Sequence, residues 1–495
     1  MKKKYDVMQI ITYDETETSK SGLNETKVKN PGIGVRHLQS LLLALCVFCG
    51  YLIRVNLSVT ILAMTKPEEP TESKQDYGFP AYYWDEDVQG WLHASFFLGY
   101  LVMNFPAACL GVYFNLKMLL LISTIVNGML DCMTPILINM DYNGTNEFLL
   151  QIKEILGEGN WRVFAVLRTM QGMIQAFMIP TIHAIIAQWA PPNERGRLVG
   201  FIMTGIPFGT MVALAGSGEL TSNANLGWPS VFYISGVCSI LWALFWGWFG
   251  FSSPSAHPTI SSEEYNYICS ELPPKSEKKV PWIDLFTSLP VWAIVIAHTT
   301  HNWGFWLLLS EMPTFLHAVS GFNIKSDGLL SSTPYVTMWL LQFPVMWVAD
   351  TLNKRGITSL TISRKIWTSI GLWGSAAGLL VLGHLDNNTL AAVSLYIVSV
   401  GIGCCCNVGF NVNHMDLTSN YAGIAMGLSN GIAATGGFGA PLMVSVLVQD
   451  ITSVSQWRTV FYAGAGILFL GNLFFVLFGS GETQSWNNKH KDTRC

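Results

Sequence analysis

Apolar residues in this chain gather into long runs that short polar segments separate. Each run has about 20 residues or more, which is enough to cross the hydrocarbon core of a bilayer as a helix. The twelve runs are 38–64, 88–113, 117–139, 161–187, 198–220, 229–250, 289–316, 328–350, 365–384, 389–412, 421–447 and 457–479. The pattern predicts an all-α membrane protein with twelve transmembrane helices.

The polar positions divide these spans into two sets of six. A polar stretch that contains SSEEYNYICSELPPKSEKKVP lies between the sixth and seventh spans. We therefore expect an N-terminal tail at 1–37, a six-helix half at 38–250, a linker at 251–288, a second half at 289–480 and a C-terminal tail at 481–495. Two six-helix halves are typical of transporters built from internal repeats, whose site lies between them near the membrane midplane.

Composition and charge agree with this interpretation. Half of the residues are hydrophobic and only 12% are charged, against about a quarter in soluble domains. Most of the 28 Lys and Arg residues fall in segments that become cytosolic if the N-terminus is cytosolic. Both termini, and the linker, are therefore expected in the cytosol. The acidic loop 65–87 and the sequons at Asn143 and Asn387 then lie outside, where both asparagines can be glycosylated.

Ionisable residues inside membrane spans are costly and usually face the interior of the helix bundle. Arg54 lies in the first span and Arg168 in the fourth. At about 100° per residue, one stripe of about 120° holds Arg168, Gln171, Gln175 and His183. Comparable polar stripes occur in three other spans: Tyr51 with Arg54, His298 with His301 and Asn302, and Asn407 with Asn411 and His414. Spans 1, 4, 7 and 10 thus carry polar faces at matching places in a three-helix repeat.

Structural roles compete with functional ones at these positions. Arg54 could pair with a buried acid, but the sequence shows no obvious acid at its depth. A single histidine such as His183 or His298 suits hydrogen-bonded packing as well as ligand binding. Acidic residues near span ends are interpreted as groups that reach water or form gate or hinge pairs: Asp131, Glu311, Asp350 and Asp416.

Two unpaired cations that face one cavity suit an anionic ligand. The guanidinium group offers a planar fork of donors that matches carboxylate and phosphate. A negative membrane potential opposes anion entry by about 2.3 kcal/mol per charge per 100 mV. Concentrative uptake would therefore require a co-transported cation, Na⁺ or H⁺, although the sequence shows no buried acid that must carry a proton.

Several segments together resemble solute carrier family 17. They are RVNLSV, GWLHASFFLGY, RTMQG, QWAPPNERGRL, HNWGFWLLLSEMPTF, GFNVNHMDL and MGLSNGIAATGG. The similarity covers about 36–487 and is greatest to insect members described as inorganic phosphate cotransporters. It implies the major facilitator fold, alternating access and phosphate or organic-anion substrates. The resemblance implies no enzyme activity, and we expect no cofactor, metal or nucleic-acid partner.

The resemblance also implies roles for individual residues. The family's arginines correspond to Arg54 and Arg168, and His93 matches a histidine of the vesicular glutamate branch. His301 stands where that branch has a third arginine. Gln175 stands where the sialic-acid and glutamate branches have a glutamate tied to proton coupling. Because glutamine cannot titrate, this departure favours sodium coupling.

A second departure lies between the second and third spans. Transporters of this fold usually carry a charged, glycine-rich turn there, which stabilises one conformation through ion pairs. Here the turn reads LGVYFNLKM and only Lys117 is charged, whereas the turn ADTLNKRG in the second half keeps its charges. The loss puts normal gating in doubt.

We therefore predict a secondary active transporter of small anions, at the plasma membrane rather than in lysosomes or vesicles. Sodium-coupled transport of inorganic phosphate or an organic anion is the leading hypothesis. The alternatives are a proton- or potential-driven carrier of acidic sugars or amino acids, and a non-transporting sensor that keeps the fold. We expect substrate contact from Arg54, Arg168, Gln175, His301, Asn302 and Asn411, and supporting or coupling roles for Tyr51, His93, His183, His414 and Asn430.

Overall fold

The computed structural model describes residues 30–65, 79, 81–139, 160–272, 280–312, 314–316, 328–385 and 389–488. The elements named in this part are all helices, and one isolated bridge joins Thr65 to Tyr82. Ten helical stretches of the described residues are long and apolar enough to cross a membrane. The other two predicted spans correspond to α13 with η2, and to α15. The predicted all-α membrane fold is thus confirmed.

The helices follow the predicted spans closely. The first half contains α1 (Val35–Val55), α2 (Leu57–Met64), α3 (Glu86–Tyr113), α4 (Leu116–Asn139), α6 (Asn160–Gln175), α7 (Met178–Trp189), α8 (Arg195–Met203), α9 (Gly205–Ser222) and α10 (Gly227–Phe249). The linker contains η1 (Pro254–Ala256), α11 (Ser262–Glu271) and α12 (Trp282–Thr287). The second half contains α13 (Leu289–Trp306), η2 (Leu307–Glu311), α15 (Gly328–Lys354), α16 (Leu360–Leu382), α17 (Thr389–Ile402), η3 (Gly403–Asn407), α18 (Phe410–Leu417), α19 (Ala422–Ala433), α20 (Gly436–Leu447), α21 (Val454–Phe478) and η4 (Ser485–Asn488).

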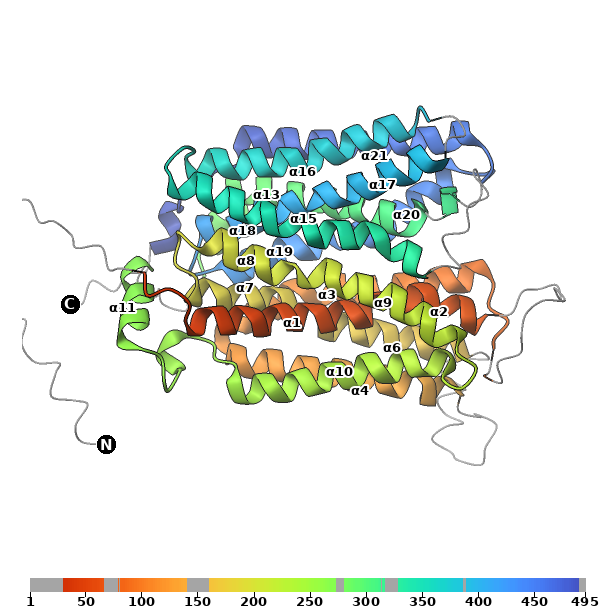
Figure 1. The fold of residues 1–495 in the computed structure, drawn as a ribbon, viewed down its shortest axis with the longest axis horizontal. Helices are drawn as coiled ribbons and strands as arrows, with labels where there is room; N and C mark the ends of the chain where they lie inside the picture. The colour runs from red at the N-terminus through yellow and green to blue at the C-terminus, as the bar shows by residue number, and fades with distance from the viewer. Residues whose placement is uncertain are drawn as a thin grey trace, which may run out of the picture.

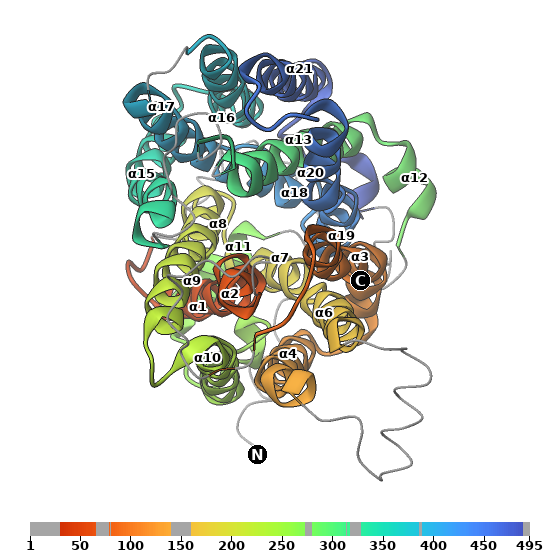
Figure 2. The same ribbon diagram turned by 90° about the vertical axis from the view of Figure 1, so that its right-hand side faces the viewer.

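The helices form two bundles that lie side by side. Figure 1 shows the first half, red to lime, below the second half, green to blue, with their helices roughly parallel. The end of the molecule that carries the start of α1 and the linker helix α11 is called the linker face below (Figure 1). Seen along the helices, α8 and α9 lie against α15, and α19 lies against α3 and α7, at the boundary between the bundles (Figure 2).

Several spans are interrupted near their middle. α1 gives way to α2 at Asn56, and α6 gives way to α7 across Ala176 and Phe177. The tenth span contains the 3₁₀-helix η3 between two α-helices. Helix ends place backbone carbonyl and amide groups where side chains or ligands can bind them. In transporters such breaks surround the substrate site.

Glycines of α19 allow the two halves to approach closely near the linker face. A Cβ at Gly423 would lie 2.9 Å from both the Cβ of Ala184 and the carbonyl oxygen of Pro180, on α7. A Cβ at Gly427 would collide with Ala108 of α3. Small residues allow this backbone approach between helices. The glycine spacing in AGIAMGLSNGIA therefore sets the distance between the halves at this end.

Candidate anion site and linked polar clusters

Arg54 lies in the last turn of α1, only 9% exposed, among three aromatic rings. Its Cζ is 4.2 Å from the ring centroid of Tyr100, 5.0 Å from that of Tyr51 and 5.2 Å from that of Phe96. Its Nε donates a hydrogen bond to Oε1 of Gln175 at 2.9 Å. Aromatic faces attract a cation without neutralising it. Because no carboxylate of the described residues forms an ion pair with Arg54, its charge remains available to a ligand.

Arg168 of α6 shares the Phe96 ring with Arg54, with its Cζ 5.1 Å from the ring centroid. Its Nη1 donates to the carbonyl oxygen of Ile53 at 3.3 Å, and its Nη2 donates to that of Arg54 at 3.4 Å. These carbonyl groups belong to the C-terminal turn of α1, where the helix dipole favours a cation. Nη1 also donates to Oε1 of Gln171 at 3.3 Å. The break between α1 and α2 thus positions the second guanidinium.

Each guanidinium keeps one buried nitrogen whose hydrogens have no acceptor among the described residues. These donors are Nη2 of Arg54 and Nε of Arg168. A buried donor left unpaired costs about 1–3 kcal/mol, and more when it is charged. Carboxylate and phosphate oxygens are the acceptors that fit such donors. The pair can therefore bind a small anion.

Two side chains connect the arginine pair to its surroundings. Gln175 uses both ends of its amide, because Oε1 accepts from Arg54 and Nε2 donates to the carbonyl oxygen of Gly50 at 2.6 Å. The hydroxyl of Tyr100 accepts a hydrogen bond from Nδ2 of Asn430 at 2.6 Å. Since Asn430 belongs to α19, this bond links the Arg54 pocket to the second half.

Of the predicted residues, Tyr51, Gln175 and both arginines come together directly. Tyr51 accepts a hydrogen bond from Nη1 of Arg54 at 3.4 Å. His93 lies on the face of α3 that also carries Phe96, one turn further along. Sequence reasoning missed Phe96 and Tyr100, although GWLHASFFLGY was singled out. Their spacing of three and seven residues from His93, which places all three on one helix face, was a usable signal.

His301 and Asn302 of α13 make their contacts within the second half. The ring of His301 lies 5.5 Å from that of Phe410 and lines a cavity of about 20 Å³. Nδ2 of Asn302 donates to the carbonyl oxygen of Ala433 at 3.3 Å, at the break between α19 and α20. Neither residue forms a hydrogen bond or ring contact with the arginines in the described structure, so their predicted substrate contact stays a prediction.

Asn411 belongs to a chain of amides in the second half. Its Nδ2 donates to Oδ1 of Asn407 at 3.1 Å, and Nδ2 of Asn407 donates to Oε1 of Gln342 at 2.9 Å. Oδ1 of Asn411 is buried without a partner among the described residues. The expected stripe of Asn407 and Asn411 therefore exists, but its contacts run to α15.

Two buried histidines contact Ser429 of α19, and a third packs against one of them. The Ser429 hydroxyl lies 3.1 Å from Nδ1 of His298 and 2.7 Å from Nε2 of His414. The rings of His183 and His414 lie 5.8 Å apart and join the two halves. His183 shares a stripe with Arg168 in the sequence but lies far from it along the span, so its predicted supporting role stays a prediction. Fifteen residues of helix separate them by about 22 Å along the axis, and α6 ends before α7 begins.

Asp131 was expected to reach water near a span end, and this expectation is wrong. It is 0% exposed in α4. Its Oδ1 accepts from Nε2 of Gln171 at 2.9 Å, and its Oδ2 accepts from Nδ2 of Asn56 at 3.3 Å and from the hydroxyl of Ser235. Hydropathy placed Asp131 near a span end but could not show that α10 packs along α4 and covers the carboxylate.

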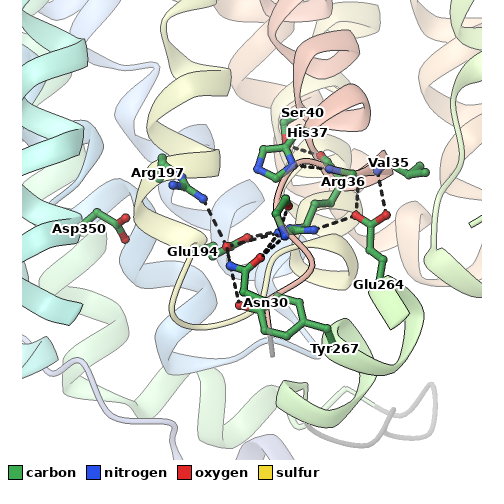
Figure 3. A network of polar contacts seen from close by, with 12 residues as sticks. Asn30, Val35, Arg36, His37, Ser40, Glu194, Arg197, Glu264, Tyr267 and Asp350 are labelled. Atoms are coloured by element: carbon green, nitrogen blue, oxygen red, sulfur yellow. Dashed lines mark hydrogen bonds and ion pairs between the residues drawn. The ribbon is translucent and has the colours of Figure 1, made fainter. Parts of the chain in front are cut away.

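A charged cluster at the linker face was also missed. Arg36 is fully buried, with its Nε 2.8 Å from Oε2 of Glu194 and its Nη1 2.9 Å from Oε1 of Glu264 (Figure 3). The Glu264 carboxylate also accepts from the backbone N–H groups of Val35 and Arg36, at the N-terminus of α1. Burial raises the pKa of Glu194, but the hydrogen bond and charge of Arg36 outweigh it, so the pKa lies below its usual value. The cluster attaches the linker helix α11 to the first half.

The two acidic residues expected to pair at the cytosolic ends form ion pairs, whereas their role as gate or hinge pairs stays a prediction. Asp350 pairs with Lys354 at 2.8 Å, and Asp416 pairs with Arg364 at 2.7 Å. In the turn LGVYFNLKM, by contrast, the Lys117 ammonium lies 4.5 Å from the centroid of a phenyl ring. The turn of the second half therefore contains an ion pair, whereas the charged residue of the first turn contacts an aromatic ring.

Some predictions fall outside the described residues. The sequons at Asn143 and Asn387 and most of the acidic loop at 65–87 belong to this group. Glycosylation and the role of that loop therefore stay predictions. Among the described residues, no group of His, Cys, Asp and Glu is arranged to hold a metal ion.

Comparison with known proteins places these observations in a family. The profile of the Major Facilitator Superfamily matches residues 43–441. Sialin of Homo sapiens is 35% identical over 463 residues, which cover 90% of this chain and 89% of sialin. Vesicular glutamate transporter 3 of Danio rerio is 33% identical, covering 100% of this chain and 83% of that protein. This chain belongs to solute carrier family 17. A "Putative inorganic phosphate cotransporter" of Drosophila melanogaster is 31% identical over 92% of this chain and 87% of its own length.

Solved structures agree with this family assignment at the level of the fold. The proton:xylose symporter XylE, bound to 6-bromo-6-deoxy-D-glucose, has a TM-score of 0.64 at 15% identity, covering 91% of this chain and 97% of its own. A bacterial homologue of the lysosomal transporter Spinster has a TM-score of 0.53 at 15% identity. As a member of solute carrier family 17, the chain is a multi-pass membrane transporter and not an enzyme.

Proposed function

We propose that this chain is a secondary active transporter that carries inorganic phosphate or a small organic anion together with sodium, by alternating access. The observation that carries the proposal is the pair of buried guanidinium groups of Arg54 and Arg168, each with a free N–H donor beside the Phe96 ring. The hydrogen bond between Tyr100 and Asn430 supports alternating access, because it connects the second half directly to the Arg54 pocket.

Two observations favour phosphate and sodium as the first pair to test. The amide at Gln175 cannot titrate, so the residue that touches Arg54 cannot carry a proton. The Drosophila relative is named as a phosphate cotransporter. Sialin and the vesicular glutamate transporter favour a second candidate, a proton- or potential-driven carrier of acidic sugars or amino acids. A non-transporting sensor is the third, motivated by the turn at Lys117.

Uptake of radiolabelled phosphate tests the proposal in cells that express the chain, with sodium present or replaced by choline. Surface labelling would establish whether the protein reaches the plasma membrane, as we propose. Arg168→Ala removes one guanidinium and is expected to abolish uptake. Arg162→Ala is the matched control, because Arg162 is an exposed arginine of the same helix.

Sodium-dependent uptake that Arg168→Ala abolishes and Arg162→Ala preserves would support sodium–anion cotransport. Wild-type uptake in Arg168→Ala would refute the arginine site. If no phosphate enters although the protein is at the surface, phosphate is the wrong substrate. Sialic acid and glutamate would then be tested across a pH step, and failure of all three would favour the sensor.

A further inference from the structure

Asp131 is a buried carboxylate that the anion site does not explain. It lies in α4, covered by α10, and the close approach of these helices depends on glycine. A Cβ at Gly128 would lie 2.7 Å from the carbonyl oxygen of Gly236. The carboxylate receives hydrogen bonds from two amides and a hydroxyl, but it forms no ion pair with a described residue. An ionised carboxylate without a partner cation is costly in such an environment.

Gln171 connects this carboxylate to the anion site. Its Oε1 accepts from Nη1 of Arg168 at 3.3 Å, while its Nε2 donates to Oδ1 of Asp131 at 2.9 Å. The orientation of the amide is fixed, because turning it over would point its NH₂ group at a guanidinium and its oxygen at a carboxylate. A carboxylate that served only to hold Arg168 would contact it directly. Here one side chain separates the two charges while linking them.

Several oxygen atoms near Asp131 have no hydrogen-bond partner in the part of the chain that the structure describes. They are Oδ1 of Asn56, Oδ1 of Asn127 one turn before Asp131 on α4, and the hydroxyl of Ser239 one turn after Ser235 on α10. Asn127 and Ser239 line a cavity of about 10 Å³ that also reaches Gln175. A cavity of this size holds about one water molecule. Buried oxygen atoms without donors are the environment that a hard cation or a proton satisfies.

Hydrogen-bond accounting shows that the cluster also accommodates a proton. The Ser235 hydroxyl has one hydrogen but three competing acceptors, the Asp131 carboxylate and the carbonyl oxygens of Val231 at 2.7 Å and Phe232 at 3.3 Å. If Asp131 carries a proton, it can donate to Ser235, and Ser235 can donate to Val231. All three groups are then satisfied. In the ionised form the Ser235 hydrogen goes either to the carboxylate or to a backbone carbonyl oxygen, and the other acceptor lacks it.

We propose that Asp131 binds the co-transported cation, Na⁺ or H⁺, and that its neutralisation strengthens anion binding at Arg168 through Gln171. This inference rests on the proposed transport function and assigns its coupling site. With Asp131 ionised, the cluster of Arg54, Arg168 and Asp131 has one net positive charge. With the cation bound it has two, so cation and anion bind cooperatively.

Few charged groups act on Asp131 from the helices packed against it. On α6 the neighbouring charge is Arg168, whereas Arg162 lies near the far end of the helix. α10 and α2 carry no charged residue, and the titratable residue of α7, His183, lies beyond the break that separates α7 from α6. On its own helix, Lys117 lies at the opposite end. The charge of Arg54 on α1 completes the set, so among the described residues Asp131 is the acid placed to alter the arginine pair.

The test uses purified full-length protein and does not require the anion to be known. The midpoint of thermal unfolding is measured in NaCl against choline chloride at constant ionic strength, and from pH 5 to 8.5, for the wild type and Asp131→Asn. The substitution keeps the shape of the side chain but removes its charge. Glu219→Gln is the control, because it removes an exposed carboxylate of α9. A response to sodium identifies Na⁺ as the ion, and a response to pH alone identifies H⁺.

We expect the wild type and Glu219→Gln to respond to one of the two cations and Asp131→Asn to lose that response. The same response in Asp131→Asn, or none in the wild type, would overturn the proposal. If Asp131→Asn does not fold, the double variant N56D/D131N returns a carboxylate to a position whose partner atom lies 3.3 Å away. A folded double variant that responds supports the proposal, and one that does not respond contradicts it.

A second measurement separates this inference from the proposed function. Where an anion is transported, the cation should lower its half-saturating concentration about tenfold in the wild type and less than about twofold in Asp131→Asn. Anion exchange without a cation gradient should persist in the variant. If no phosphate is transported at all, the proposed substrate fails while the unfolding experiment still tests Asp131.

Discussion

The close approach of α19 to α7 predicts that an added methyl group will push the halves apart at the linker face. In Gly423→Ala, the new Cβ would lie 2.9 Å from Cβ of Ala184 and 2.9 Å from the carbonyl oxygen of Pro180. Carbon atoms in good contact are about 3.5–4.0 Å apart, so one helix must move by about 0.6–1 Å. The Pro180 oxygen is a backbone atom and cannot rotate away.

Overpacking of this kind costs about 1–3 kcal/mol. If the contact exists only while the linker face is closed, the cost falls on that state alone. The equilibrium should then shift about 5- to 150-fold toward the state that is open at this end. Gly427→Ala should shift it further, because its Cβ would come closer to its neighbour on α3.

Hydrogen–deuterium exchange of the purified protein measures this shift. Peptides from α7 and α19 should exchange faster in Gly423→Ala, while peptides from α9 should not change. Gly216→Ala is the matched control, since nothing lies within 4 Å of a Cβ added there. The double variant G423A/A184G should recover part of the wild-type protection, because it removes one of the two close contacts. Unchanged exchange in Gly423→Ala would refute the reasoning.

Three further changes test the pocket and the linker cluster. Tyr100→Phe removes the acceptor of the Asn430 bond and should lower anion affinity about five- to tenfold, because one hydrogen bond contributes about 1 kcal/mol, as measured by concentration-dependent uptake. Gln175→Glu places a carboxylate 2.9 Å from Nε of Arg54 and should weaken anion binding at least tenfold, which the same assay would show. The pKa of Glu194 is lowered, so its stabilising contribution is present above its usual range and is lost as pH falls through the lowered value. The difference in unfolding midpoint between wild type and Glu194→Gln should therefore shrink from pH 7 to pH 3, and a constant difference would contradict this.

The helices and the arginine pair could be predicted because both depend on short-range rules. Hydropathy and length locate the spans, and the cost of a cation in lipid marks Arg54 and Arg168. Helical periodicity predicts which residues share a face, but it does not report depth. His183 and Arg168 share a stripe in the sequence and yet lie in different clusters, because residues at similar angles around a helix can be far apart along its axis. The burial of Asp131 could not be predicted, because it depends on which helix covers the carboxylate. That packing joins segments far apart in the chain.

The two glutamines of α6 give the two arginines different electrostatic surroundings. Each presents its Oε1 to one guanidinium, Gln175 to Arg54 and Gln171 to Arg168. The groups behind the two amides differ, because Nε2 of Gln175 donates to a backbone carbonyl and Nε2 of Gln171 donates to Asp131. A backbone carbonyl cannot change its charge, whereas a carboxylate can. The environment of Arg54 is therefore fixed, and any cation that alters the site through these contacts must act on Arg168.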